Sequence, residues 1–278
     1  MSLFFSAASH TGVHRETNED SYCARPDLGL FAVADGVGGY EAGEVASRAA
    51  TDAIEQAIAD TQGWAEDTTW PFEYQPALGV GGNRLNWALH LANARIRTEI
   101  TAARGRQGMA TTVAAVLFDS DATGVREPVR GATIGHVGDS RVYRWRAGKL
   151  DRMTRDHSWV EDQVRSGALS ADEARRHPRR NLLTRALTGG AEPQADFGWA
   201  PLAAGDALLL CSDGLFGVLS DAQMAGILAR DGADATGAGA SGSTCDALVH
   251  AANLAGGPDN ITVILVRLSG DPSESTVP

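Results

Sequence analysis

The chain has 278 residues, and its 24 lysines and arginines stand against 35 aspartates and glutamates, which gives a formal net charge of −11. This length is enough for one large domain, or at most two small ones, with a buried core. The acidic balance argues against a nucleic-acid-binding protein, because phosphate backbones require a basic surface.

Lys149 is the only lysine, and this scarcity excludes several enzyme classes. A Walker loop, Schiff-base catalysis and a protein kinase each need a placed lysine, whereas Lys149 lies in a predicted exposed turn. The three cysteines, Cys23, Cys211 and Cys245, form no CxxC pair. Neither a zinc ribbon nor a disulfide framework is therefore expected, and the cysteine usage fits a reducing compartment.

No targeting or membrane segment is expected. The N-terminal sequence has no basic region and only a short apolar stretch, unlike a signal peptide. No run approaches the roughly 18 apolar residues that a membrane-spanning helix needs. These observations predict a cytoplasmic protein without a membrane span, and we expect a monomer.

Apolar periodicity predicts strands and helices in a mixed order. Along the chain these are a strand at 28–34, helices at 45–58 and 85–96, strands at 112–118, 132–137, 142–145 and 207–211, a short helix at 247–254 and a strand at 261–268. Two long helices precede a cluster of hairpin-like strands. This order favours an α+β fold with antiparallel sheets over a doubly wound parallel sheet, and we expect one domain over residues 1–268.

Three regions interrupt the pattern. Residues 61–83 contain Trp64 and Trp70 and predict an ordered insertion, because flexible linkers lack tryptophan; for Trp70 and Trp87 we expect core packing. Residues 231–243 are rich in Gly, Ala and Ser and predict a mobile surface loop. The polar residues 269–278 predict a disordered tail.

Acidic residues recur at the ends of the predicted strands. They are Asp35, Asp139 and Asp213 after three strands, Asp259 before the last strand, and Glu19 with Asp20 between two early ones. A single such aspartate is usually a turn former or a helix N-cap, but five acidic positions at strand ends favour a common function. Carboxylates gathered at one end of a sheet raise one another's pKa unless cations neutralise them.

An all-oxygen ligand set selects hard divalent ions, namely Mg²⁺, Mn²⁺ or Ca²⁺. The glycines after Asp35 and Asp213 let the backbone approach closely, so a carbonyl could also serve as a ligand. Spacing alone leaves open whether these carboxylates converge.

Six short motifs strengthen this interpretation. They are RxxNED at 15–20, ADGVGG at 34–39, GMATT at 108–112, GDSR at 138–141, SDG at 212–214 and DNIT at 259–262. Each is weak evidence alone, but in this order they cover roughly residues 6–268, and the chain resembles the metal-dependent protein phosphatases of type 2C. The resemblance implies a sandwich of two antiparallel sheets flanked by pairs of helices, four layers in the order α-β-β-α.

The resemblance also implies a site for two Mn²⁺ or Mg²⁺ ions at one end of the sandwich, between the sheets. Asp35 would bridge both ions, and the Gly36 carbonyl and Glu19 would bind one of them. Asp213 and Asp259 would bind the other. Such ions, about 3.5–4 Å apart, lower the pKa of a water between them.

Four further positions match the family pattern. Asp139 would take a third, weaker ion together with Asp213. Asp20 and Asn260 would lie just outside the ligand set, with Asp20 orienting metal-bound water. Arg15 matches a phosphate-binding arginine, whose planar fork suits bidentate contact.

The implied activity is hydrolysis of phosphoserine and phosphothreonine on proteins by a hydroxide that bridges the two ions, without a protein nucleophile. Its partners would be phosphoproteins and a bacterial Ser/Thr kinase whose action it reverses. The alternative is a catalytically silent member of the same fold that binds phosphoproteins or acts as a scaffold. The complete set of acidic positions favours the enzyme.

Three positions near these motifs need separate interpretation. Val37 stands where many family members have a histidine that can protonate the leaving group, so the identity of the general acid stays open between metal-bound water and His136. The penultimate position of His136 in its strand fits a core histidine better. His157 matches a recurring family segment, and we expect a structural role for it.

Residues of about 155–190 correspond to a variable flap beside the metal site in the family. The basic residues in it are Arg175, Arg176, His177, Arg179, Arg180 and Arg185. They form either a solvated helix face or a basic patch that receives the phosphopeptide.

The glycine-rich turn at 36–38 superficially resembles a dinucleotide-binding turn. The third glycine position is Glu41, however, and the charge of Asp35 would repel a pyrophosphate, so a nucleotide site is not favoured.

Overall fold

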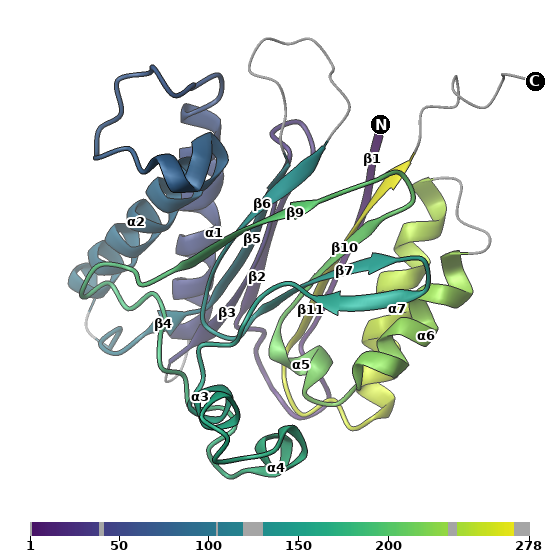
Figure 1. Ribbon diagram of the computed structural model, residues 1–278. Coiled ribbons are helices and arrows are strands. Elements are labelled where there is room, and N and C mark those ends of the chain that lie inside the picture. Colours follow the sequence, from purple (N-terminus) through teal and green to yellow (C-terminus); the bar gives the residue numbers. More distant parts are fainter. Residues whose placement is uncertain (1, 39–41, 104, 119–129, 233–237, 270–278) are drawn as a thin grey trace, which may run out of the picture.

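The computed structural model describes residues 2–38, 42–103, 105–118, 130–232 and 238–269. Within them the strands form two antiparallel sheets that face each other (Figure 1). The five-stranded sheet runs in the order β1 (Ser2–His10), β11 (Ile261–Ser269), β10 (Ala207–Cys211), β7 (Arg141–Arg146) and β8 (Lys149–Arg152). The six-stranded sheet runs in the order β2 (Asp20–Arg25), β3 (Leu30–Val37), β5 (Val113–Phe118), β6 (Gly131–Val137) and β9 (Asp196–Pro201), with β4 (Ala110–Thr111) paired to β3.

Helices cover the outer faces of both sheets, which confirms the predicted α+β sandwich of four layers (Figure 1). On the six-stranded sheet lie α1 (Ala42–Asp60) and α2 (Gly79–Ala102), with the one-turn η1 (Pro76–Leu78) before α2. On the five-stranded sheet lie α5 (Asp213–Phe216), α6 (Asp221–Gly232) and α7 (Ala238–Leu254). The short helices α3 (Trp159–Arg165) and α4 (Ala171–Arg176) project from one end.

Each interface between layers has its own apolar core, and β3 contributes to two of them. Phe31 and Val33 pack between the sheets, whereas Leu30 and Ala32 pack against α1 and α2. A strand buried on both faces reads as a continuous apolar run, which is why this strand was readable from the sequence. The helical periodicity at 45–58 and 85–96 is confirmed in the same way, since those apolar faces cover the sheet.

The predicted insertion at 61–83 is ordered. Trp64, Trp70, Phe72, Tyr74 and Trp87 form a chain of aromatic contacts with ring centroids 5.0–5.4 Å apart. The core packing expected for Trp87 is confirmed, because this residue of α2 packs against the core under the six-stranded sheet. For Trp70 the expectation is wrong, because it is half-buried and packs in this aromatic cluster instead.

The insertion ends earlier than predicted, because residues 79–83 already belong to α2. Three glycines in this turn hide the helical signal, since glycine disfavours helix interiors. The Asn83 side chain compensates by bonding the backbone N–H and carbonyl of Gln75 (2.9 and 2.8 Å) and the Gly79 carbonyl (2.7 Å).

The loop predicted at 231–243 is wrong at both ends, because Gly232 closes α6 and residues 238–243 belong to α7. Alanine has the highest helix propensity, and the helix continues into buried Cys245 and Leu248. Residues 233–237 lie outside the described residues, as does the predicted tail beyond Ser269. Among the helices of the described residues, none is long and apolar enough to cross a membrane.

Candidate active site

Several chain segments that are distant in sequence meet at one end of the sandwich around a cavity of about 210 Å³. The cavity is lined by Arg15, Glu19, Asp35, Gly36, Val37, Gly38, Thr112, Asp139, Asn181, Leu183, Asp213, Asp259 and Asn260. The predicted ligand positions are thus brought together in one place. Asp20 does not line the cavity and lies behind it.

Asp35 lies within β3 and not after the strand end, because β3 runs three residues further than predicted. Its backbone N–H donates to Thr112 Oγ1 (3.1 Å), and its carbonyl accepts from the Thr112 N–H and from Thr111 Oγ1 (2.9 Å each). Neighbouring β2 places Asp20 directly opposite Asp35. The strand pairing therefore fixes both residues at one end of the sheet.

Gly36 allows a close approach between β3, α1 and the segment before β2. A Cβ atom at this position would lie 2.1 Å from the Gly43 carbonyl oxygen and 2.6 Å from the Glu19 carbonyl oxygen. The Gly36 N–H donates to that Glu19 carbonyl (3.1 Å). Only glycine fits here, which explains the Asp-Gly pair.

Asn260 joins the Glu19 segment to the start of β11. Its Oδ1 accepts from the Glu19 N–H (2.8 Å), and its Nδ2 donates to the carbonyls of Thr11 and Thr17 (2.9 Å each). The Glu19 carboxylate accepts a hydrogen bond from the backbone of Gly43, in the first turn of α1. Burial nevertheless raises the pKa of Glu19, against the lowering effect of Arg15.

Asp213 and Asp259 enter the cavity from the five-stranded sheet. Asp213 begins α5 directly after β10, and Asp259 stands just before β11. The Arg15 guanidinium forms an ion pair with Asp259 (2.8 Å). A Cβ atom at Gly214 would lie 2.0 Å from the Asn260 carbonyl oxygen, so α5 and the Asp259 segment are in close contact.

Asp20 is buried, and a hydrogen bond holds only its Oδ2 atom. Ser212 Oγ donates to its Oδ2 (2.7 Å) and accepts from the Thr262 N–H (3.0 Å). Removal from solvent raises the pKa of Asp20 to about 7.

The acids share an unfavourable electrostatic environment. Removal from solvent, followed by repulsion from neighbouring carboxylates, raises the pKa of Asp35 and of Asp139 well above the ordinary range. The same causes raise the pKa of Asp213 to about 6. Within the described part of the chain, Asp20 Oδ1 and Asp213 Oδ1 have no hydrogen-bond partner. Buried carboxylates of this kind fit divalent cations, which would neutralise them and accept their free lone pairs.

Sequence reasoning missed three residues of the cavity wall. Thr112 belongs to the GMATT motif, and its hydroxyl accepts from the Asp35 N–H (3.1 Å) and forms a hydrogen bond with Ser140 Oγ (2.7 Å). Asn181 and Leu183 come from the flap and carry no sequence signal. Backbone bonds place them: the Trp159 N–H donates to the Leu182 carbonyl, and Leu183 forms a bridge with Ser158.

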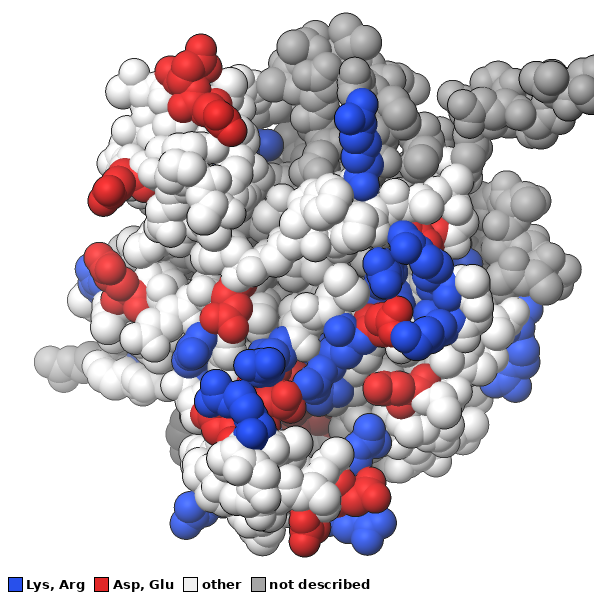
Figure 2. All heavy atoms as spheres, in the orientation of Figure 1, with Lys and Arg blue, Asp and Glu red and all other residues white. Residues whose placement is uncertain are grey.

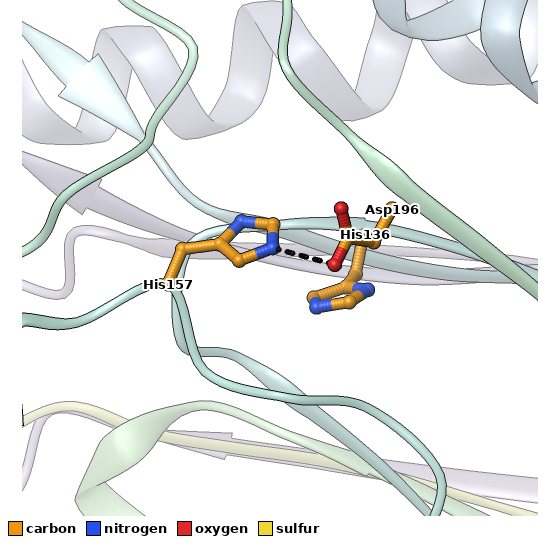
Figure 3. Close-up of side chains that lie close together, drawn as sticks. All are labelled: His136, His157 and Asp196. Carbon is orange, nitrogen blue, oxygen red and sulfur yellow. Dashed lines mark ion pairs between the residues drawn. The ribbon is translucent and has the colours of Figure 1, made fainter. Parts of the chain in front are cut away.

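His136, a possible proton donor in the sequence, lies outside the cavity lining. It is buried, its ring stacks on His157 at 4.6 Å, and its Nε2 is 2.7 Å from the Arg155 carbonyl oxygen (Figure 3). This arrangement is that of a core histidine. Val37 lines the cavity and is 47% exposed at its rim.

At least two of the six basic flap residues have partners. Arg185 pairs with Asp196 (2.8 Å), and the Arg179 guanidinium lies 5.2 Å from the centre of the Trp159 ring. Figure 2 shows blue and red side chains interleaved on this face of the molecule. Ion pairs such as Arg152 with Glu161 (2.8 Å) account for this mixture.

Comparisons with known proteins agree with this geometry. The family model of protein phosphatase 2C matches residues 11–231. The chain is 32% identical to the serine/threonine protein phosphatase PstP of Mycobacterium tuberculosis, over 99% of this chain and 50% of that protein, so it spans about half the length of this relative. It is also 32% identical to protein phosphatase PhpP of Streptococcus pneumoniae, over 97% of this chain and 99% of that protein. A crystal structure of the catalytic domain of PstP with two manganese ions matches with a TM-score of 0.75 and 31% identity, over 96% of this chain and 99% of that one.

Proposed function

Because the chain belongs to the protein phosphatase 2C family, we propose that it is a metal-dependent phosphatase that hydrolyses phosphoserine and phosphothreonine on proteins. The observation that carries the proposal is the convergence of five acidic side chains in one cavity, where several have raised pKa values. Divalent cations would neutralise such a cluster at neutral pH, and the family relationship indicates the reaction.

The ligands fall into two groups around Asp35. Asp35, the Gly36 carbonyl and Glu19 would hold one Mn²⁺ or Mg²⁺ ion, and Asp35 with Asp213 and Asp259 would hold the other. When bound, the pair supplies a bridging hydroxide at neutral pH and neutralises the charge that develops on the phosphate. The two manganese ions of the related PstP structure support this assignment.

Asp139 completes the set as a ligand of a third, weaker ion, shared with Asp213. Burial, and after it repulsion from Asp213, raises the pKa of Asp139, which supports this placement. Asp20 and Asn260 contribute indirectly. Asp20 presents one oxygen without a protein partner within the described residues, and Asn260 holds the Glu19 backbone in place.

Arg15 would bind the substrate phosphate. Its guanidinium is half-exposed at the cavity wall, and Asp259 orients it through a single nitrogen, Nη2. The planar fork leaves further N–H donors for phosphate oxygens. With Val37 at the rim and His136 in the core, the leaving alkoxide would take its proton from water in the metal site.

We further propose a cellular setting for this activity. Residues 1–268 would form one catalytic domain that acts as a monomer in the cytoplasm and reverses a bacterial Ser/Thr kinase. The three cysteines are free and buried, which is typical of proteins from reducing compartments.

Metal removal tests the proposal. EDTA-treated protein is expected to lose hydrolysis of both an aryl phosphate and a phosphothreonine peptide, and added Mn²⁺ or Mg²⁺ is expected to restore both. Hydrolysis that persists in EDTA would contradict the metal-dependent mechanism. Mn²⁺ binding without any hydrolysis would instead assign the chain to the silent, phosphoprotein-binding class.

Substitution of Arg15 by lysine tests the phosphate contact. The charge is kept but the bidentate geometry is lost, so KM for the phosphothreonine peptide is expected to rise about tenfold, with a smaller change in kcat. The matched control is Arg230→Lys on the exposed face of α6, which is expected to change neither constant. An unchanged KM for Arg15→Lys would remove Arg15 from the phosphate site.

A further inference from the structure

His157 lies near the start of the flap and contacts both the loop that carries Asp139 and the later flap residue Thr184. Its N–H donates to the Gly138 carbonyl (2.9 Å), and its Nδ1 accepts from the Gly138 N–H (3.1 Å). Its own carbonyl accepts from the N–H of Thr184 in the flap (2.8 Å). The imidazole is only 4% exposed, so these contacts are shielded from water.

The hydrogen bonds define the tautomer of this ring. Because Nδ1 accepts a hydrogen bond, the proton of the neutral ring is on Nε2. Nε2 faces Asp196 Oδ2 at 3.3 Å, as the dashed line in Figure 3 marks. Burial and the neighbouring His136 lower the pKa of His157, which favours the neutral form. Asp196 thus selects the tautomer that leaves Nδ1 free to accept from Gly138.

A metal site at these side chains is not favoured. The potential ligand atoms of His136, His157 and Asp196 lie within 4.8 Å of one another. The Arg185 guanidinium, however, is 2.8 Å from Asp196 and 3.3 Å from His157 Nε2. Its positive charge already neutralises the carboxylate and would repel a second cation.

Gly138, the residue before Asp139, has a backbone conformation that only glycine adopts easily, so its hydrogen bonds must hold it in place. Gly138 adopts φ of +100°, and a Cβ atom there would lie 2.5 Å from Thr112 Cβ. The next residue, Asp139, is 8% exposed and interacts with Asp213. The hydrogen bond that the Gly138 N–H donates to His157 Nδ1 therefore restrains the residue that precedes Asp139, and with it the direction of the Asp139 carboxylate.

We propose that His157 is a positioning residue that fixes the backbone of Gly138, through the tautomer selected by Asp196, and thereby sets the direction of Asp139 and the affinity of the third ion site. This inference rests on the proposed function for the identity of the ion. It connects the flap to the Asp139 carboxylate through the backbone of Gly138.

Two variants separate the roles of the two ring nitrogens, Nδ1 and Nε2. In His157→Asn, the amide Oδ1 occupies the place of Nδ1 and keeps an acceptor for the Gly138 N–H. In His157→Gln, the longer amide reaches towards Asp196 but leaves no acceptor at the Nδ1 position. Mn²⁺ titration of the metal-stripped proteins, followed by the electron paramagnetic resonance of free Mn²⁺, measures each site, and aryl phosphate hydrolysis is recorded separately.

The expected result is a weak-site affinity about tenfold lower in His157→Gln and within threefold of the wild type in His157→Asn, with both tight sites unchanged. Equal affinities in wild type and His157→Gln, or equal losses in both variants, would overturn the proposal. If the wild-type protein binds Mn²⁺ normally but does not hydrolyse the aryl phosphate, the proposed function is contradicted and the inference on His157 is not.

A third variant keeps the inference testable where His157→Gln does not fold. Asp196→Asn removes the carboxylate that selects the Nε2–H tautomer, and its amide can donate to Nε2 instead. The ¹⁵N chemical shift of His157 Nδ1 is expected to show partial protonation, and the weak-site affinity is expected to fall. An unchanged tautomer and an unchanged affinity would overturn the proposal.

Discussion

Replacement of Asp35 by asparagine is expected to abolish hydrolysis and, at the same time, to stabilise the metal-free protein. The carboxylate would contact both ions, which together contribute several kcal/mol of transition-state stabilisation, so activity is expected to fall at least about 10³-fold. Without metal, the same carboxylate destabilises the fold. Its removal from solvent and the nearby Asp20 and Asp213 raise its pKa. Above the ordinary pKa of an aspartate, the carboxyl ionises more easily in the unfolded chain than in the fold, so the fold loses stability.

The amide keeps the shape of the side chain and removes the charge. We expect the free energy of unfolding of the metal-free protein to rise by on the order of 2 kcal/mol, a few degrees in melting temperature. Saturating Mn²⁺ is expected to reverse the order, because ligand binding stabilises only a protein that holds the ion. Calorimetric melting curves with EDTA and with Mn²⁺ measure both effects.

The matched control is Asp52→Asn, on the exposed face of α1. It is expected to leave activity unchanged and to shift the melting temperature equally with and without Mn²⁺. A metal-free Asp35→Asn protein that is less stable than the wild type would show that the Asp35 carboxylate is not repelled by its neighbours.

The sequence predicts the acidic residues of the site well, because each stands next to an apolar run. Strand order and register cannot be predicted in this way. Asp20 faces Asp35 because β2 and β3 pair in one particular register, and Asp213 comes from the opposite sheet. Convergence therefore depends on the packing of two sheets, and only the resemblance to a family anticipated it.

The cavity residues of the flap are harder still to predict from the sequence. Asn181 and Leu183 line the cavity, yet no apolar period or motif marks them. Their position depends on backbone hydrogen bonds, such as Thr184 N–H to the His157 carbonyl (2.8 Å) and the pair between Leu187 and Thr111 (2.9 Å each). Backbone bonds of this kind use groups that every residue has, so side-chain patterns do not encode them.

Gly36→Ala is expected to destabilise the protein by about 3 kcal/mol or more and to weaken metal binding. The added methyl would lie 2.1 Å from the Gly43 carbonyl oxygen and 2.6 Å from the Glu19 carbonyl oxygen. Both contacts are with backbone, so no side chain can rotate away. The first turn of α1 must move from β3, and the Gly43 hydrogen bond to the Glu19 carboxylate would be lost with it.

Gly226→Ala provides the matched control, because the same methyl group is added without a clash. Gly226 lies on the exposed face of α6, and a Cβ atom there has no neighbour within 4 Å. Alanine favours helices over glycine, so this variant is expected to gain about 0.5–1 kcal/mol. Urea unfolding measures both free energies, and Mn²⁺ titration of the folded fraction of Gly36→Ala is expected to show affinity about 10–100-fold lower. Wild-type stability in Gly36→Ala would mean that β3 and α1 can separate freely, and the close approach would then have no part in holding Glu19 at the site.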